Sequence, residues 1–137
     1  KTLKNYLCYT GADFITPNLL ELRNLYFKLD NENKDIVKAC KNLKKKYKFK
    51  NILVTRGEKG ITLYNKNLIK HFISKVKSVF DVSGAGDTVV SVLATCINMK
   101  MSLSNSANYA NIAGGHVVSL TGTQPISFKK FKEIIKI

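Results

Sequence analysis

The pattern of apolar and polar residues along the chain predicts alternating helices and strands. From Lys34 to Lys48, apolar residues recur at the spacing of one face of a helix, with lysines elsewhere. The segment Asn51–Thr55 is β-branched and apolar and is followed by a glycine-containing loop, which predicts a strand. Similar reasoning predicts strands at 12–16, 61–64 and 68–73, helices at 18–28, 87–98 and about 104–119, and a last helix, capped by Ser127, that runs to 137.

The order of these elements indicates an α/β domain with a largely parallel sheet. Residues 1–11 show no clear period and are expected to form a loop or a short helical turn, and residues 76–82 an extended segment. The apolar run that starts near 88 predicts a buried helix. Ligands bind open α/β sheets at the carboxyl ends of strands. Three loops therefore become candidate sites: 16–18 with Glu21, 55–60, and 81–87.

Length and composition narrow the class of protein. The 137 residues are 45% hydrophobic, enough for one domain or part of one, and the chain starts at Lys1 rather than Met, which is compatible with a fragment or a processed product. No apolar run reaches the length of a membrane span, and the first residues lack a signal-peptide core. The three cysteines lie far apart without CxxC spacing, which favours a reducing cytoplasm, with Cys40 and Cys96 buried.

The formal net charge of +14 raises the question of nucleic-acid binding. Lysine carries nearly all of this charge, since Arg23 and Arg56 are the only arginines. Proteins that read bases and phosphates usually use more arginine. The composition therefore favours no specific nucleic-acid partner, although a positive field would still attract a phosphorylated small molecule.

The segment Asp81–Thr88 carries the strongest candidate chemistry. Gly84-Ala85-Gly86 leaves the backbone open to a ligand and feeds directly into the predicted helix. A glycine turn at a helix start points N–H groups at one spot, where the helix dipole favours a phosphate. Asp87 lies at the rim and can accept a proton. The alternative is that Asp87 only caps the helix and the glycines only form a turn.

The other two candidate loops are ambiguous on their own. Thr55-x-Gly57-x-x-Gly60 follows a predicted strand, but such a sequence can be a simple turn. Asn18-x-x-Glu21 can be an N-cap with its capping box and nothing more. The three motifs in this order are a much more specific signal than any one of them.

Together these motifs resemble the ribokinase-like (PfkB) carbohydrate kinases, over nearly the whole chain. The family signature Asp-Thr-x-Gly-Ala-Gly-Asp is matched by residues 81–87, with a departure at Val82. The family's Asn-x-x-Glu motif and Thr-x-Gly-x-x-Gly loop are matched at 18–21 and 55–60, and its late helix and following loop by Ala110-Asn111, Gly114-Gly115 and Gly122-Thr123. The resemblance implies a three-layer α/β/α fold and ATP-dependent phosphoryl transfer to a sugar hydroxyl.

The resemblance also implies a role for each matched residue. Asp87 would be the general base, and the N–H groups of Gly84, Ala85 and Gly86 would form the anion hole. Nucleotide and Mg²⁺ binding would fall to Asn18, Glu21 (to Mg²⁺ through water), Thr55, Arg56, Gly57, Glu58, Gly60 and, beside the adenine, Asn111. Some family members also bind a monovalent cation such as K⁺, here near Asp81, Ser83 and the backbone of 117–122.

Within the family, several stretches are similar to the heptose-phosphate kinases of lipopolysaccharide precursor synthesis. These enzymes phosphorylate O1 of D-glycero-β-D-manno-heptose 7-phosphate, and their kinase module is often fused to an adenylyltransferase. The matching stretches are 16–18, 53–58, 79–89 and 122–127. Another sugar acceptor of the same family is the alternative.

The resemblance places residues 1–137 in the C-terminal, nucleotide-binding half of such a kinase, without the N-terminal half and lid that supply most sugar contacts. We therefore expect a homo-oligomer or association with a missing N-terminal half, and no membrane partner. A catalytically incomplete nucleotide-binding fragment is the alternative to an active kinase.

Overall fold

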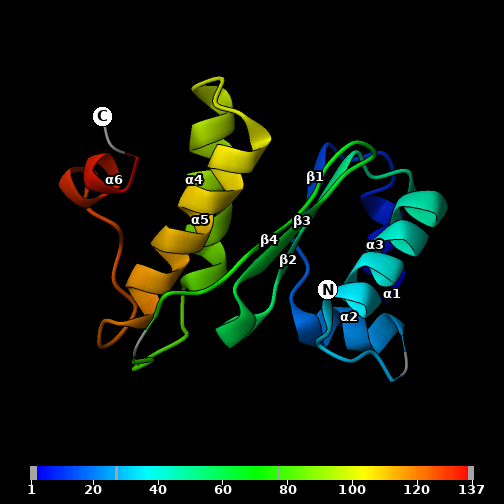
Figure 1. Ribbon diagram of the computed structural model, residues 1–137, viewed down its shortest axis with the longest axis horizontal. Coiled ribbons are helices and arrows are strands. Elements are labelled where there is room, and N and C mark those ends of the chain that lie inside the picture. Colours follow the sequence, from blue (N-terminus) through cyan, green and yellow to red (C-terminus); the bar gives the residue numbers. More distant parts are fainter. Residues whose placement is uncertain (1–2, 27, 77, 136–137) are drawn as a thin grey trace. The chain divides into compact units, whose positions relative to one another are not determined.

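The computed structural model describes residues 3–26, 28–76 and 78–135, with side chains from Tyr6 onward (Figure 1). The chain divides into two compact units, Lys1–His71 and Phe72–Ile137, and each unit is described by itself.

The first unit is built on a mixed four-stranded sheet. Its strands follow the order β1 (Phe14–Ile15), β2 (Asn51–Thr55), β3 (Ile61–Tyr64) and β4 (Ile69–Phe72). β1 pairs with β2 in parallel, whereas β2 pairs with β3 antiparallel, with Leu53 opposite Leu63. The prediction of a largely parallel sheet is therefore wrong for this unit. The five residues between β2 and β3 are too few for the crossover that a parallel pair needs.

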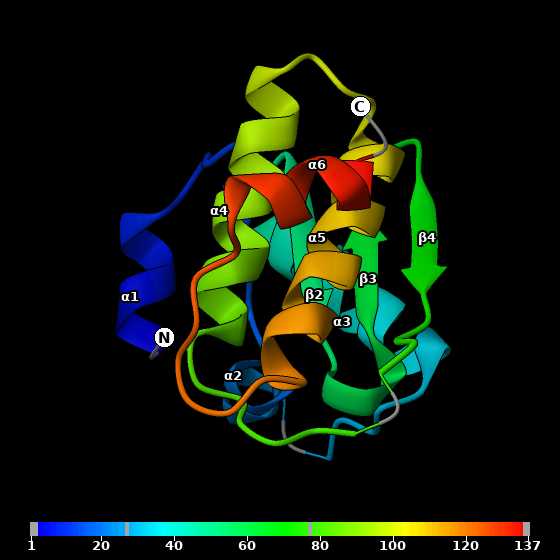
Figure 2. The same cartoon turned by 90° about the vertical axis from the view of Figure 1, so that its left-hand side faces the viewer.

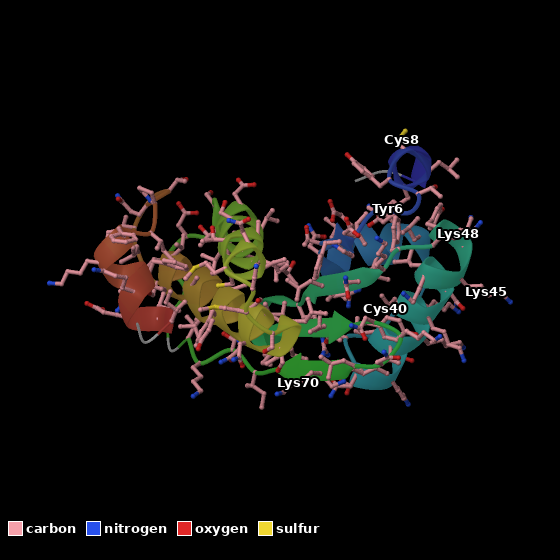
Figure 3. The ribbon with its side chains drawn as sticks, turned by 90° about the horizontal axis from the view of Figure 1, so that it is seen from above. Tyr6, Cys8, Cys40, Lys45, Lys48 and Lys70 are labelled. Atoms are coloured by element: carbon pink, nitrogen blue, oxygen red, sulfur yellow. The ribbon has the colours of Figure 1, made fainter. Side chains whose placement is uncertain are left out.

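Three helices and the sheet enclose the core of the first unit. They are α1 (Leu3–Cys8), α2 (Leu19–Leu25) and α3 (Asn33–Tyr47). α3 confirms the predicted helix, and its apolar stripe is buried as expected. Cys40 points inward from α3, while Lys45 and Lys48 point out into solvent (Figure 3). The core also includes the adjacent aromatic rings of Tyr6, Tyr47 and Phe49.

Two helix boundaries differ from the predictions. The predicted helix 18–28 ends at Leu25, because Tyr26 turns to an extended conformation and Lys28 has a left-handed φ of 66°. The N-terminal segment, expected to be a loop or short helical turn, contains the six-residue helix α1, and Tyr6 of this helix is fully buried. Burial of one aromatic side chain thus fixes a segment that shows no sequence period.

The second unit consists of helices α4 (Ala85–Asn98), α5 (Leu103–Val118) and α6 (Phe128–Ile135). α4 and α5 lie side by side (Figure 2). A Cβ on Gly114 of α5 would lie 2.7 Å from Val89 Cγ2 of α4, so the close approach of these helices depends on glycine. At the start of α6, Ser127 Oγ accepts the Lys130 N–H at 3.1 Å, which confirms the predicted cap. The predicted helix end at 137 lies outside the described residues.

The expectation that the helix after residue 87 is buried holds for only one of its faces. Val89, Val92, Leu93 and Cys96 of α4 are buried, but Val90 is 45% exposed. A run of apolar residues cannot by itself distinguish a helix that is covered all round from one that is covered on one side. None of the described helices combines the length and the apolar composition needed to cross a bilayer.

The packing of α3 gives a stability prediction. Leu43→Ala removes a fully buried side chain and leaves a cavity, so we expect the free energy of unfolding to fall by about 3 kcal/mol. Leu20→Ala is the matched control, because Leu20 also lies on a helix but is 67% exposed, and it should change stability by less than about 0.5 kcal/mol. Denaturant unfolding followed by circular dichroism measures both. Equal effects of the two substitutions would contradict the described core.

Candidate functional site

In the first unit, two of the candidate loops lie next to each other. The N–H of Thr55 donates to the Pro17 carbonyl at 3.0 Å, and Asn18 and Thr55 form a parallel bridge. These contacts arise because β1 and β2 are parallel, so that their carboxyl ends meet at one edge of the sheet. The structure therefore brings Asn18, Glu21 and Thr55 together, as the loop positions predicted.

Asn18 and Glu21 form a complete capping box at the start of α2. Asn18 Oδ1 accepts the Glu21 N–H at 2.7 Å, and Glu21 Oε2 accepts the Asn18 N–H at 3.0 Å. The structural alternative for this motif is thus confirmed. Carboxylate oxygens are ligands that Mg²⁺ and its bound water accept in proteins. The role of these two residues at a phosphate or Mg²⁺ stays a prediction.

The Thr55–Gly60 loop is closed by its own backbone. The Arg56 N–H donates to the Gly60 carbonyl at 2.8 Å, and the Gly60 N–H donates to the Gly57 carbonyl at 2.9 Å. Gly57 and Gly60 have φ angles of 61° and 78°, a region that favours glycine, and a short 3₁₀ turn (Gly57–Lys59) lies between Arg56 and Gly60. The backbone conformation of the loop by itself therefore explains why glycine occupies both positions.

Arg56 is buried, which its place in this loop did not predict. It was expected among the nucleotide-binding residues, yet its side chain is only 3% exposed and donates to Asn31, Asn33 and Thr62. Burial lowers the pKa of Arg56. Contact of its side chain with a nucleotide stays a prediction. The partners Asn31 and Asn33 were missed because no local pattern links them to a residue about 25 positions away.

In the second unit, the predicted glycine turn forms the start of α4. Gly84 is the N-cap and has a left-handed φ of 77°. A Cβ at this position would lie 2.9 Å from Thr123 Cγ2, so Gly84 meets both a conformational and a steric requirement. Since Gly84 is the cap, the alternative that Asp87 caps the helix is wrong. Asp87 is the third residue of α4 and is exposed.

The backbone donors at the start of α4 that lack a backbone acceptor differ from the predicted set. The Ala85 N–H, expected in the anion hole, donates to the Val82 carbonyl at 3.3 Å. The N–H groups of Gly86 and Asp87 belong to the first turn, and no backbone acceptor lies within hydrogen-bond distance of them in the part of the chain that the structure describes. The N–H of Asp87 is a donor that the sequence prediction did not include.

Asp81 stabilises the approach to the turn. Its Oδ1 accepts the Ser83 N–H at 2.8 Å, and the neighbouring Phe80 N–H donates to the Val118 carbonyl at 2.8 Å. Hydrogen bonds from the backbone and the hydroxyl of Ser83 lower the pKa of Asp81. The described residues contain no group of three or more His, Cys, Asp and Glu side chains that could hold a metal ion.

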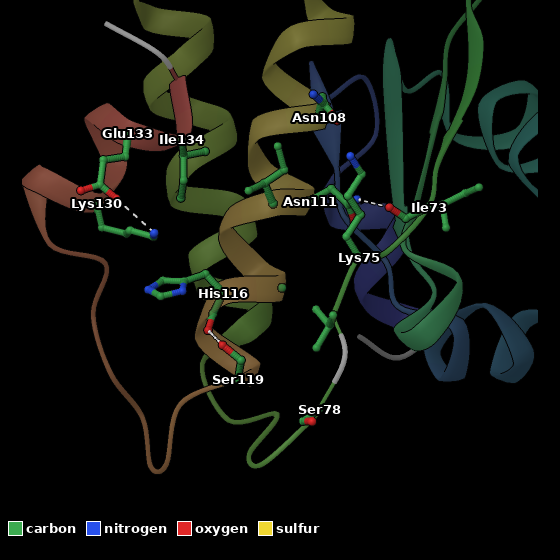
Figure 4. A pocket seen from close by; sticks show the side chains of 13 residues that line it. Ile73, Lys75, Ser78, Asn108, Asn111, His116, Ser119, Lys130, Glu133 and Ile134 are labelled. Carbon is green, nitrogen blue, oxygen red and sulfur yellow. Dashed lines mark hydrogen bonds and ion pairs between the residues drawn. The ribbon is translucent and has the colours of Figure 1, made fainter.

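A cavity of about 650 Å³ lies in the second unit, between α5, α6 and residues 73–78 (Figure 4). Asn111 lines it and donates through Nδ2 to the Ile73 carbonyl at 3.0 Å, so that the amide ties α5 to the segment after β4. His116 lines the same cavity, and an ion pair between Lys130 and Glu133 of α6 lies at its margin. Its volume lies within the range of small-molecule sites.

Comparisons with known proteins find matches over most of the chain. The model of the pfkB family carbohydrate kinases matches residues 2–130. The chain is 41% identical over 128 residues to the bifunctional protein HldE of Pasteurella multocida, covering 93% of this chain and 27% of that protein. The chain thus spans little more than a quarter of the length of the curated relatives it matches.

Solved structures resemble this chain in fold. A ribokinase of Arabidopsis thaliana complexed with ribose and ATP matches with a TM-score of 0.77 and 25% identity, over 93% of this chain and 42% of that one. Phosphofructokinase-2 of Escherichia coli in complex with potassium matches with a TM-score of 0.82 and 21% identity, over 95% and 42%. These likenesses confirm the predicted α/β fold class of the ribokinase-like kinases.

The contacts of Asp81 give a prediction about its ionisation. Ser83→Ala removes the hydroxyl and keeps the N–H, so we expect the pKa of Asp81 to rise towards, but not reach, its ordinary value of 3.8. Because the folded-state pKa is lowered, the stabilisation is present above the unfolded pKa and is lost as the pH falls through the folded pKa. NMR titration of the carboxyl carbon measures the change. Ser91→Ala, at an exposed position of α4, is the control and should leave the pKa of Asp81 unchanged. An unshifted pKa in the parent chain would contradict the turn geometry.

Proposed function

This chain belongs to the pfkB family of carbohydrate kinases, and on that premise we propose that it transfers the γ-phosphoryl group of ATP to a sugar hydroxyl. The observation that carries the proposal is the start of α4, where Gly84 opens the backbone and the N–H groups of Gly86 and Asp87 have no backbone acceptor among the described residues. A transferred phosphoryl group needs positioning and charge stabilisation more than covalent catalysis. Backbone donors and a neighbouring carboxylate supply both.

In the proposed reaction, Asp87 is the general base. Its carboxylate accepts the proton of the sugar hydroxyl as that oxygen forms a bond to the γ-phosphorus. The bond between the γ-phosphorus and the β–γ bridging oxygen breaks, and ADP leaves with that oxygen. Free N–H groups at the helix start, together with Gly84, stabilise the charge on the phosphoryl oxygens during transfer.

Each unit by itself contains candidate residues for nucleotide binding. Asn18, Glu21 and the Thr55–Gly60 loop form the set for the phosphates and ribose, and Glu21 holds Mg²⁺ through water. Asn111 and the cavity that it lines form the set for the adenine. Bound Mg²⁺ would neutralise phosphate charge. The ribokinase complexed with ribose and ATP supports ATP as the nucleotide, and the phosphofructokinase-2 in complex with potassium supports K⁺ as a further cofactor. We propose that K⁺ binds near Asp81 and Ser83.

For the acceptor, we propose O1 of D-glycero-β-D-manno-heptose 7-phosphate, in the synthesis of lipopolysaccharide precursors. The identity of 41% to a bifunctional protein HldE supports this choice, together with the sequence stretches that resemble heptose-phosphate kinases. Another sugar of the same family is the second candidate. Assays of ADP release with heptose 7-phosphate, fructose 6-phosphate and ribose distinguish them.

We further propose that residues 1–137 act as the C-terminal, nucleotide-binding part of a larger kinase domain. The chain covers 42% of the Arabidopsis ribokinase and 44% of a ribokinase of Thermotoga maritima, which supports a requirement for more chain or a partner. In that case the chain alone binds ATP but transfers phosphate only when a sugar-binding part is supplied. Assembly into a homo-oligomer is the alternative way to complete the site.

The role of Asp87 gives a prediction about activity. Asp87→Asn keeps the size of the side chain and removes the base, so turnover should fall about 10²- to 10⁴-fold while the dissociation constant for Mg·ATP changes little. A coupled ADP-release assay measures turnover, on the chain alone or together with the sugar-binding part if transfer requires it. Asp13→Asn, at an exposed ion pair with Lys50, is the control and should have no effect. Comparable turnover by Asp87→Asn would exclude Asp87 as the base.

A further inference from the structure

A polar network in the first unit ties the Thr55–Gly60 loop to residues 31–33, which precede and begin α3. Arg56 lies at its centre. Nε of Arg56 donates to Asn31 Oδ1 at 2.8 Å, and Nη2 donates to the Asn31 carbonyl at 2.8 Å. Nη1 donates to Asn33 Oδ1 at 2.6 Å and to Thr62 Oγ1 on β3 at 3.0 Å. Four hydrogen bonds thus fix one guanidinium group.

The connection between Arg56 and Asn31 is reciprocal. Asn31 Nδ2 donates back to the Arg56 carbonyl at 3.3 Å, so this amide contacts both the side chain and the backbone of Arg56. Farther along the loop, Lys59 Nζ donates to the same Asn31 carbonyl at 2.9 Å and pairs with Glu32 at 2.7 Å. Arg56 itself is only 3% exposed, whereas the Lys59–Glu32 pair is about half exposed, with 48% and 62% of the two side chains accessible.

The chemistry of the network is unusual for a buried cation. Among the described residues, no carboxylate forms an ion pair with Arg56. Its acceptors are two amide oxygens, one backbone carbonyl and one hydroxyl, and the Thr62 hydroxyl in turn lies 2.8 Å from His71 Nδ1. Burying a charge without a counter-ion is costly unless directional hydrogen bonds satisfy it. A hydrophobic residue at position 56 would stabilise the core at a lower desolvation cost. The network is therefore better explained by the fixed orientation that it gives to the loop.

We propose that Arg56 is a positioning residue which, with Asn31, holds the Thr55–Gly60 loop in the shape that binds the nucleotide. The inference rests on the proposed function, because it assumes that this loop binds ATP. A loop with two left-handed glycines has many alternative conformations, and fixing it before binding reduces the entropy lost on binding. In this inference the guanidinium acts on the loop through its hydrogen bonds to Asn31, Asn33 and Thr62.

The geometry also explains why lysine is a poor substitute at this position. A guanidinium is a planar fork that reaches Asn31, Asn33 and Thr62 at once, whereas an ammonium group is a single point. Arg56→Lys therefore retains the positive charge but loses the simultaneous hydrogen bonds to these three partners. Asn31→Ala makes the complementary change, because it removes the amide and leaves Arg56 in place. If Arg56→Lys does not fold, Asn31→Ala decides the question.

The experiment compares these two variants with Glu32→Gln, the matched control. Glu32→Gln removes the charge from the exposed link between the same two segments and leaves the contacts of Arg56 in place. Hydrogen exchange of the Gly60 amide, which donates to the Gly57 carbonyl, reports loop order without nucleotide. Calorimetric titration with Mg·ATP, well below the unfolding midpoint of each variant, reports affinity in the folded state.

We expect exchange at Gly60 to become about tenfold faster, and Mg·ATP binding about tenfold weaker, in Arg56→Lys and in Asn31→Ala. Glu32→Gln should stay within about twofold of the parent in both measurements. A merely structural residue would lower the unfolding midpoint without changing the affinity of the folded chain. Unchanged affinity in the two folded variants would therefore overturn the proposal, and so would unchanged exchange.

The same data separate this inference from the proposed function. If the parent chain binds Mg·ATP and the variants bind it equally well, only the positioning role is wrong. If the parent chain does not bind Mg·ATP, the proposed function fails and the nucleotide role of the loop fails with it, whatever the exchange rates are.

Discussion

The left-handed backbone of Gly84 is the constraint on which the candidate transfer site depends. Its φ of 77° and the contact that a Cβ would make with Thr123 together require glycine. Because the chain turns at Gly84, α4 begins at Ala85, and its first free N–H groups belong to Gly86 and Asp87. The same turn places Asp87 in the first turn of α4, where it is exposed. The proposed base and the N–H groups proposed to bind the phosphoryl group thus lie within four consecutive residues.

In the first unit, polar contacts of side chains give the candidate loops their shape. Its candidate loops lie together because β1 and β2 are parallel, and each loop is stabilised by polar contacts. Asn18 and Glu21 cap α2, while Arg56 and Asn31 hold the loop after β2. Asn18 and Glu21, which we propose to act at the phosphates and Mg²⁺, are therefore also the residues that give the start of α2 its shape. Such dual use favours a site that is formed before the nucleotide arrives.

Local patterns predicted α3, the strands of 51–55 and 61–64, and the Ser127 cap, because the relevant periodicity or cap residue lies within the element itself. Strand direction between β2 and β3 and the one-sided burial of α4 were not predicted, since both depend on neighbours distant in sequence. Arg56 shows the limit most clearly. Its place in a recognised loop suggested ligand contact, but its partners Asn31 and Asn33 lie on another segment and occupy its donors.

The central claim is that the start of α4 receives the transferred phosphoryl group. NMR of the backbone amides during titration with Mg·ADP and aluminium fluoride, a mimic of that group, tests it most directly. The account predicts saturable shifts of the Gly86 and Asp87 amides that Mg·ADP without aluminium fluoride does not produce. Unchanged Gly86 and Asp87 amides, while amides elsewhere in the chain reach saturation with the same ligand, would contradict it.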